Sequence, residues 1–201
     1  MKNQILVLLL ATSPLFIQAQ NATQNDKEFL FNYYQETLNQ LDENISGLTE
    51  TQLHFKPSEN SWSISQCVEH IILTENMIFE MLKGYMAQPA NPERRNEIVY
   101  SDEQIIKMVT DRSEKYKAPE VLQAEGKYDD AETAFKDLEN QRKEILEFIK
   151  NADLEDLRNH VSDSPAGPTD AYQSLLFLAG HTARHTLQIE EVKADTHFPK
   201  N

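Results

Sequence analysis

Residues 169–193 read TDAYQSLLFLAGHTARHTLQIEEVK, and the apolar spacing in this stretch decides the fold. The residues with heptad-like spacing in it are Leu175, Leu178, Ile189 and Val192. Such spacing is typical of a helix that packs inside a bundle of helices. Two polar residues, Thr182 and His185, interrupt this apolar stripe in its middle, where the core of a bundle should be driest.

Three further segments carry apolar residues at steps of three and four, which predicts amphipathic helices over residues 26–48, 63–84 and 130–150. A weaker segment, residues 101–116, predicts a shorter helix. Residues 118–128 resemble a crossover connection, residues 162–168 a loop, and no run alternates cleanly enough for a strand. We therefore predict an all-α fold, a four-helix bundle with a crossover connection and one short extra helix.

Capping signals support two of these helices. Ser63 with Gln66 three residues later forms a capping-box pattern at the start of one helix, and Ser101 with Gln104 repeats it at the start of the shorter helix.

One charged residue departs from the apolar pattern of the predicted helix over residues 130–150. This residue is Arg142, which falls in the apolar stripe of that helix.

The composition excludes several classes of function. Of the 201 residues, 39% are hydrophobic and 26% are charged, as in an ordinary soluble globular protein. The chain has 19 lysines and arginines against 33 acidic residues, a net charge of -14. Such a chain repels both nucleic acid and an anionic membrane surface, so we expect neither as a partner. Cys67 is the only cysteine, which excludes an internal disulfide.

The N-terminus is typical of a secretory signal peptide. A basic residue, Lys2, precedes an apolar run that is interrupted by Pro14 and ends at the small residue Ala19. The run is too short for a membrane-spanning helix, which needs about 20 apolar residues. We therefore expect residues 1–19 to be removed and residues 20–201 to form one domain. That domain would be exported, periplasmic or secreted, with no stable membrane insertion after cleavage.

Three histidines form the candidate site. His181 and His185 are four residues apart on the last predicted helix, so their imidazoles lie on one face, about 6 Å apart along the axis. That is near enough to share one metal ion. His70 flanks the apolar stripe of its own helix and should border the bundle interior. Three neutral imidazoles from two facing helices would leave positions for water or substrate; the alternative is three histidines that only pack.

Two motifs give the chain a family resemblance. They are residues 56–70, KPSENSWSISQCVEH, and residues 181–189, HTARHTLQI. Both resemble the DinB-like (YfiT-type) superfamily of metal-binding four-helix bundles, and the resemblance covers nearly all of the chain after the predicted signal peptide. It implies a divalent metal ion held by three histidines, which map one for one onto His70, His181 and His185.

The resemblance also suggests a class of reaction. Members of this family are described as metal-dependent hydrolases, or as transferases and isomerases that activate a low-molecular-weight thiol. Because such thiols are cytoplasmic, export favours hydrolysis of a small molecule, with water bound at the site. A thiol-dependent S-transferase and a non-catalytic, metal-stabilised binding module are the alternatives. Imidazole ligands favour Zn or Ni and also suit Mn or Fe. The resemblance allows a homodimer through helix faces.

The remaining polar residues have no assigned role in this site, and the general base is not identified. Glu69 and Glu75 lie near His70 in the sequence, but Glu69 should point about 100° away, toward solvent. Arg184 should point off the histidine face; it pairs with a surface acid in the favoured interpretation and anchors a substrate anion in the alternative. Cys67 should be a small buried residue under Trp62, and the alternative is a fourth metal ligand or a nucleophile. The residues expected to be bystanders are His54, His160 and His197, and those expected mainly in the core are Tyr33 and Tyr34.

Overall fold

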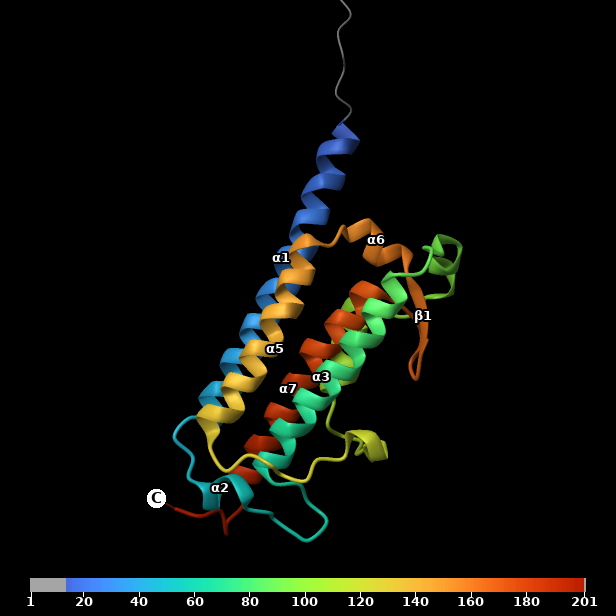
Figure 1. Ribbon diagram of the computed structural model, residues 1–201. Helices are drawn as coiled ribbons and strands as arrows, with labels where there is room; N and C mark the ends of the chain where they lie inside the picture. The colour runs from blue at the N-terminus through green and yellow to red at the C-terminus, as the bar shows by residue number, and fades with distance from the viewer. Residues whose placement is uncertain (1–13, 201) are drawn as a thin grey trace, which may run out of the picture.

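Each of the four predicted amphipathic segments forms a long helix. The computed structural model describes the backbone of residues 14–200 and the side chains of residues 25–200. The four long helices are α1 (Pro14–Ile45), α3 (Ile64–Met86), α5 (Ala131–Asn151) and α7 (Ala171–Lys193). In Figure 1, α1 and α7 run in one direction along the bundle, and α3 and α5 run in the opposite direction. The predicted four-helix bundle is confirmed.

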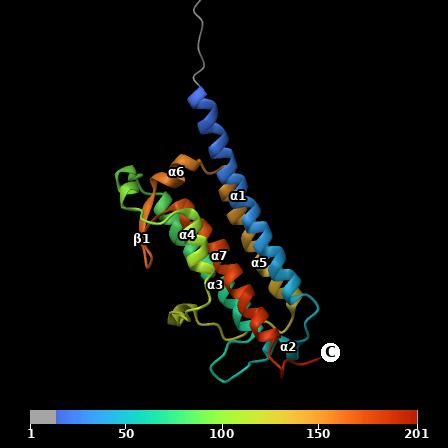
Figure 2. The same cartoon turned by 180° about the vertical axis from the view of Figure 1, so that it is seen from behind.

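Short elements connect the long helices. They are α2 (Glu50–His54), η1 (Pro92–Glu97), α4 (Asp102–Thr110), η2 (Glu120–Leu122) and α6 (Leu154–Asn159). The predicted short extra helix is α4, which ends six residues earlier than expected and packs along α7 (Figure 2). From its end the chain passes along one end of the bundle to the start of α5 (Figure 1). We name this segment, residues 111–130, the crossover.

Both predicted capping boxes are present. The Ser63 hydroxyl accepts a hydrogen bond from the backbone N–H of Gln66 at the start of α3, and the Gln66 side chain accepts one from the Ser63 N–H. Ser101 and Gln104 make the same pair of bonds at the start of α4. Each box satisfies backbone donors that the first turn of a helix leaves free.

A β-hairpin replaces the loop that was expected before the last helix. Strands β1 (Val161–Ser164) and β2 (Gly167–Asp170) pair antiparallel across a two-residue turn, with Gly167 at φ +104°. The expectation of no strand was therefore wrong. Strands of four residues are too short to show an alternating pattern in the sequence. In addition, a distant residue stabilises β1: the Asn91 side chain both donates a hydrogen bond to the backbone of Val161 and accepts one from it.

The core consists of two apolar clusters separated by a polar layer. One cluster contains Leu30, Tyr34, Ile145 and Leu175, among others. The other contains Leu41, Val68, Leu138 and Ile189, among others. Every long helix contributes polar side chains between these clusters: Thr37, His70, Thr74, Glu75, Arg142, His181, Thr182 and His185, all buried. This layer is the interruption seen in the apolar stripe of residues 169–193.

The N-terminal end of α1 extends past the rest of the bundle (Figure 1). Of the predicted signal peptide, residues 1–13 lie outside the described residues, and α1 continues without a break across Ala19. Within the described part of the chain, none of the helices combines the length and the apolar character needed to span a membrane.

Candidate metal centre

His70 lies on the inner face of α3, about two turns after its N-cap. The side chain is buried, and its Nδ1–H donates a hydrogen bond to the backbone carbonyl oxygen of Leu122 at 2.7 Å. A carbonyl oxygen can only accept, so this bond places the ring proton on Nδ1 and leaves a lone pair on Nε2. The Thr74 hydroxyl oxygen is 3.5 Å from that Nε2.

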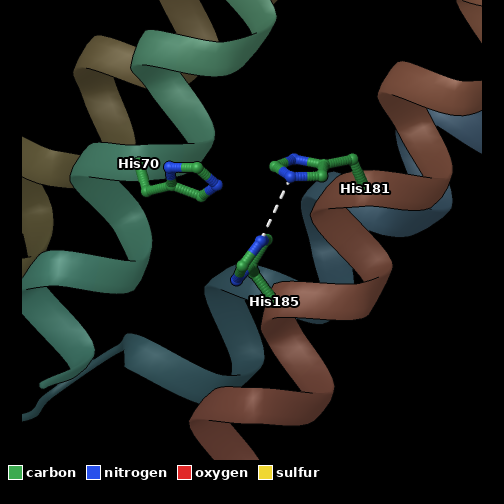
Figure 3. A group of neighbouring side chains, drawn as sticks. All are labelled: His70, His181 and His185. Carbon is green, nitrogen blue, oxygen red and sulfur yellow. Dashed lines mark hydrogen bonds between the residues drawn. The ribbon is translucent and has the colours of Figure 1, made fainter. Parts of the chain in front are cut away.

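His181 and His185 occupy successive turns of α7 and face His70 across the bundle (Figure 3). The Nδ1–H of His185 donates to Oε1 of Gln188 at 2.9 Å, which leaves a lone pair on its Nε2. That Nε2 is 3.1 Å from Nε2 of His181. The proton between these two nitrogens therefore belongs to His181, which donates it to His185.

The structure brings the three predicted site histidines together. One ring nitrogen from each lies within 4.8 Å of the other two, and all three side chains are buried. The ring centroid of His70 is 5.1 Å from that of His181 and 4.7 Å from that of His185. Two helices that run in opposite directions thus supply a single cluster of nitrogen donors.

Burial keeps these imidazoles neutral. Desolvation lowers the pKa of His181 to about 3, and the charges of His70 and Arg184 act in the same direction. The pKa of His185 is lowered well below its usual range, first by burial and then by His181 and His70. Burial also lowers the pKa of His70, against the opposing effect of its bond to Leu122. At neutral pH the cluster presents uncharged nitrogens, the form that binds metals.

The donor set fits a divalent metal ion. Two of the nitrogens that face the cluster carry lone pairs, and only one proton is available between the pair on α7. Metal-bound histidines generally donate their other N–H to a carbonyl or similar oxygen, as His70 and His185 do here. His181 differs, because its buried Nδ1 has no hydrogen-bond partner within the described residues.

Aromatic side chains form two sides of the cluster. The half-buried indole of Trp62 lies edge-on to His70, with centroids 4.8 Å apart, and stacks on His185 at 6.0 Å. Phe177 stacks on His181 at 5.8 Å and is 37% exposed. These rings limit the access of water to the histidines and offer apolar surface to a small molecule.

A buried ion pair completes the polar layer beside the histidines. The guanidinium of Arg142 on α5 donates to both carboxylate oxygens of Glu75 on α3, with a shortest distance of 2.6 Å. It also donates to Tyr34 O and Thr37 Oγ1 on α1, and to Thr182 Oγ1 on α7. Arg142 therefore joins all four long helices from its place in the apolar stripe of α5.

Glu69 does not point to solvent, and that expectation was wrong. Its side chain is buried, and its Oε2 accepts hydrogen bonds from the backbone N–H groups of Gly126 and Lys127. The helical position was assigned correctly, but the crossover covers that side of α3. Neither Glu69 nor Glu75 is free to act as a general base, because each carboxylate already has its own partners.

Arg184 also differs from its prediction. It is buried and forms no ion pair with an acid among the described side chains; its guanidinium donates to the backbone carbonyl oxygens of Val109, Asp111 and Glu114. These carbonyls belong to the end of α4 and the start of the crossover, where a helix leaves its last carbonyl groups without internal partners. Arg184 thus fixes the crossover to α7 rather than binding a substrate.

The other candidate residues lie in structural positions. Cys67 is fully buried beside Trp62 in the apolar cluster, and burial raises the pKa of its thiol to about 12, so it is a poor nucleophile. His54 pairs with Asp129 at 2.7 Å, and His197 is exposed. His160, expected to be a bystander, is buried and bonds two backbone carbonyls.

Sequence reasoning missed the outer partners of the histidines. These are the carbonyl group of Leu122 and the side chain of Arg112, which contacts Gln188. Gln188 was part of the motif 181–189, but its role was not assigned. Its position three residues after His185 places it on the same side of α7, and this spacing was the available signal. Leu122 and Arg112 belong to the crossover, and no local pattern in the sequence predicts the path of that segment.

Comparisons with known proteins agree with this fold. A family model described as the DinB superfamily matches residues 33–189. The uncharacterized protein YuaE of Bacillus subtilis (strain 168) is 25% identical over 149 residues, which cover 74% of this chain and 88% of YuaE. The structure of YfiT from Bacillus subtilis, called a probable metal-dependent hydrolase with an unusual four-helix bundle topology, superposes with a TM-score of 0.60 at 14% identity. That match covers 86% of this chain and 89% of YfiT.

Proposed function

This chain belongs to the DinB superfamily, and we propose that it is a metal-dependent hydrolase that holds a divalent ion on His70, His181 and His185. The observation that carries the proposal is the buried convergence of three neutral imidazoles, two of them with lone pairs fixed by hydrogen bonds at Nδ1. YfiT, which has the same fold, is called a probable metal-dependent hydrolase, and this supports the proposal.

The chain's own residues prepare the site for small-molecule chemistry. When bound, a divalent ion supplies Lewis acidity: it polarises a carbonyl or phosphoryl oxygen and lowers the pKa of water at the site. Trp62 and Phe177 keep bulk water from two sides of the histidines, which strengthens electrostatic interactions there. Three imidazole donors favour Zn or Ni over the harder Mn.

A non-catalytic, metal-stabilised binding module is the second candidate. The two carboxylates nearest to His70 in the sequence, Glu69 and Glu75, both accept structural hydrogen bonds. This favours the binding module, because neither carboxylate is then available as the general base of a hydrolase. The group of possible ligands within the described residues contains histidines alone. In this case the ion would stabilise the bundle by joining α3 to α7.

The first test is metal content. Elemental analysis of protein purified without a metal-affinity tag should find about one divalent ion per chain, and the double variant His181→Ala, His185→Ala should carry none. The matched control is the double variant His54→Ala, His197→Ala, which removes two histidines outside the site and should keep the ion.

Hydrolysis is tested on the metal-loaded protein. Panels of small esters, amides and phosphoesters should include a substrate whose turnover disappears in the site variant and remains in the control variant. Absence of metal from the natural protein, with no change of melting temperature on adding Zn, Ni or Mn, would refute the metal centre. Stoichiometric metal that raises the melting temperature without any turnover would instead support the binding module.

A further inference from the structure

The crossover provides the hydrogen-bond partners that lie outside the histidine cluster. Leu122 accepts the Nδ1–H of His70 through its carbonyl oxygen at 2.7 Å. At the other end of the cluster, the Nδ1–H of His185 donates to Gln188 Oε1, and that oxygen also accepts from Nη1 of Arg112 at 3.3 Å. Arg112 is the second residue of the crossover, so one segment reaches both sides of the site.

A carboxylate holds Arg112 in place. Its Nε and Nη2 donate to the two carboxylate oxygens of Glu191, each at 2.7 Å, and its side chain is only 13% exposed. Two parallel bonds of this kind fix the plane of a guanidinium. Arg184, also on α7, anchors the same part of the crossover through the backbone carbonyls of Asp111 and Glu114.

Arg112 determines which end of the Gln188 amide faces His185. An amide side chain can present either an oxygen, which accepts, or an NH2 group, which donates. Gln188 by itself therefore permits both neutral forms of the neighbouring imidazole. Arg112 carries only donors and stays protonated, so it requires the oxygen. Because His185 shares that oxygen, its Nδ1 must carry the proton, and its Nε2 must carry the lone pair.

We propose that Arg112 and Gln188 are positioning residues that hold His185 in the tautomer able to bind a metal ion through Nε2. The inference rests on the proposed metal site, but the tautomer itself is a property of the metal-free protein. His181, whose Nδ1 has no partner within residues 25–200, is not held in this way. The metal affinity of the site thus depends on a residue of the crossover whose hydrogen bonds go to Gln188 and Glu191 rather than to a histidine.

The tautomer is tested first, on the metal-free full chain. Imidazole nitrogen NMR distinguishes the Nδ1–H form from the Nε2–H form, and His185 should be in the Nδ1–H form. Gln188→Met, which has a similar volume but no amide, should shift this ring toward a mixture of the two forms. Arg112→Met should do the same although the hydrogen bond of Arg112 goes to Gln188 and not to the ring, whereas Arg112→Lys, which keeps a donor, should largely preserve the Nδ1–H form.

A double substitution separates positioning from simple loss of structure. Glu at position 188 presents only oxygens, so Gln188→Glu should fix the Nδ1–H form without help from Arg112. Arg112→Met should therefore alter the tautomer in the natural background and leave it unchanged in the Gln188→Glu background. A purely structural role of Arg112 would produce the same disturbance in both backgrounds.

Metal affinity provides the second readout. Competition with a chelator should show Zn affinity about 10- to 100-fold weaker in Gln188→Met, as expected for loss of an outer hydrogen bond to a histidine ligand. The weakening in Arg112→Met should be absent in the Gln188→Glu background. Arg95→Met serves as the matched control, because Arg95 forms an exposed pair with Glu155 outside the site.

The outcomes distinguish this inference from the proposed function. If the natural protein binds Zn and Gln188→Met binds it equally tightly with His185 still in the Nδ1–H form, the positioning role is refuted and the metal site stands. If the natural protein binds no metal, both the proposed function and the inference are refuted. Weaker Zn binding together with the altered tautomer in both single variants, rescued by Gln188→Glu, supports the inference.

Discussion

Arg142 shows how a single polar residue can organise the interior of this bundle. It stands where the pattern of α5 calls for an apolar side chain, and it is 1% exposed. All of its donor groups are engaged, by Glu75, Thr182 and two groups of α1. A buried charge is tolerated only with such complete pairing, and removing one partner leaves the other unpaired in a medium of low dielectric.

We expect Glu75→Gln to destabilise the protein by about 3–5 kcal/mol, the usual cost of leaving a buried charge unpaired. Arg142→Met should cost a similar amount, because the Glu75 carboxylate is then left without its cation. The double variant Glu75→Gln, Arg142→Met should be less destabilised than the sum of the two singles. Urea unfolding followed by circular dichroism measures all three.

The control for this experiment joins the same two helices at the surface. Glu144→Gln removes the exposed pair between Lys83 on α3 and Glu144 on α5, and it should change the midpoint of unfolding little. Equal losses in Glu144→Gln and Glu75→Gln would contradict the special role of the buried pair.

The site histidines should make the stability of the metal-free protein depend on pH. Burial lowers the pKa of His181 to about 3 and lowers that of His185 as well, whereas both take up protons near pH 6.5 in the unfolded chain. The unfolded state therefore binds more protons below that pH. It follows that their contribution to stability is present above about pH 6.5 and is lost as the pH falls toward their folded pKa values.

Replacement of one of these histidines should reduce that dependence. In His185→Gln, the slope of the unfolding free energy between pH 6.5 and 4.5 should be smaller by up to about 1.4 kcal/mol per pH unit. Chelator-treated protein, unfolded in urea at several pH values, gives the slope. His197→Gln removes a histidine that folding leaves exposed and serves as the control. A slope in His185→Gln that equals the natural one would contradict the prediction.

Residue-level prediction succeeded where a helical face was decided by spacing alone. The positions i and i+4 placed His181 and His185 together, and the stripe of α3 placed His70 toward the interior. It failed for Glu69 and Arg184, since spacing gives the direction of a side chain but not the segment that covers it. In both cases that segment was the crossover, with its backbone groups as partners.

At the scale of elements, α4 and α7 pack closely because of one glycine. Gly180 lies on α7 at the crossing, where a Cβ would overlap Cγ1 of Val109 on α4 and approach the hydroxyl of Tyr33 to 3.3 Å. Glycine normally costs a helix about 0.5–1 kcal/mol relative to alanine. At this position the absence of a side chain allows Val109 to approach the backbone of α7 closely. This contact holds α4, and with it the start of the crossover, against α7.

A matched pair of glycine substitutions tests this contact. Gly180→Ala should destabilise the protein by about 1–3 kcal/mol, because α4 must shift to admit the methyl group. Gly84→Ala on α3 should stabilise it by about 0.5–1 kcal/mol, since no described atom beyond its chain neighbours and its own helix backbone lies within 4 Å of the added Cβ. Val109→Ala should restore part of the loss in Gly180→Ala. Thermal unfolding measures each variant, and equal effects at the two glycines would rule out the proposed clash.

Elements could be predicted from the sequence in proportion to their length and capping. The long helices and both Ser-Gln capping boxes were identified, because periodicity over many residues and a local cap are properties of the chain itself. The sequence did not predict the hairpin of β1 and β2 or the short helices α2 and α6. These elements are four to six residues long and depend on distant contacts, such as that of Asn91 with Val161.

At the scale of the whole molecule, the polar layer and the crossover form one functional unit. The layer divides the apolar core, with the candidate metal centre beside the Glu75–Arg142 pair. The crossover makes α3 and α5 parallel and passes beside the histidines, where it supplies Leu122 and Arg112. The same connection that gives the bundle its topology therefore orients the site.

The N-terminal segment is expected to contribute little to this assembly. The first hydrogen bonds from α1 to the rest of the described bundle are made by Asp26, whose carbonyl accepts from Tyr172, and by Lys27, which donates to Lys150 and Ala152 carbonyls. Leu30 is the first buried side chain of the described part of α1. The N-terminal end of the described part of α1 projects beyond the bundle (Figure 1).

A chain that begins at Gln20 should therefore unfold within about 0.5 kcal/mol of the full chain, as for changes away from packed features. A chain that begins at Phe31 should lose about 2 kcal/mol or more, because it lacks the ion pair of Asp26 with Arg158, the backbone contacts of Lys27 and the buried Leu30. If residues 1–19 are a signal peptide, the mass of the exported protein should match a start at Gln20. Export with residues 1–19 retained would contradict cleavage after Ala19, and a large loss of stability on starting at Gln20 would show that this segment belongs to the folded domain.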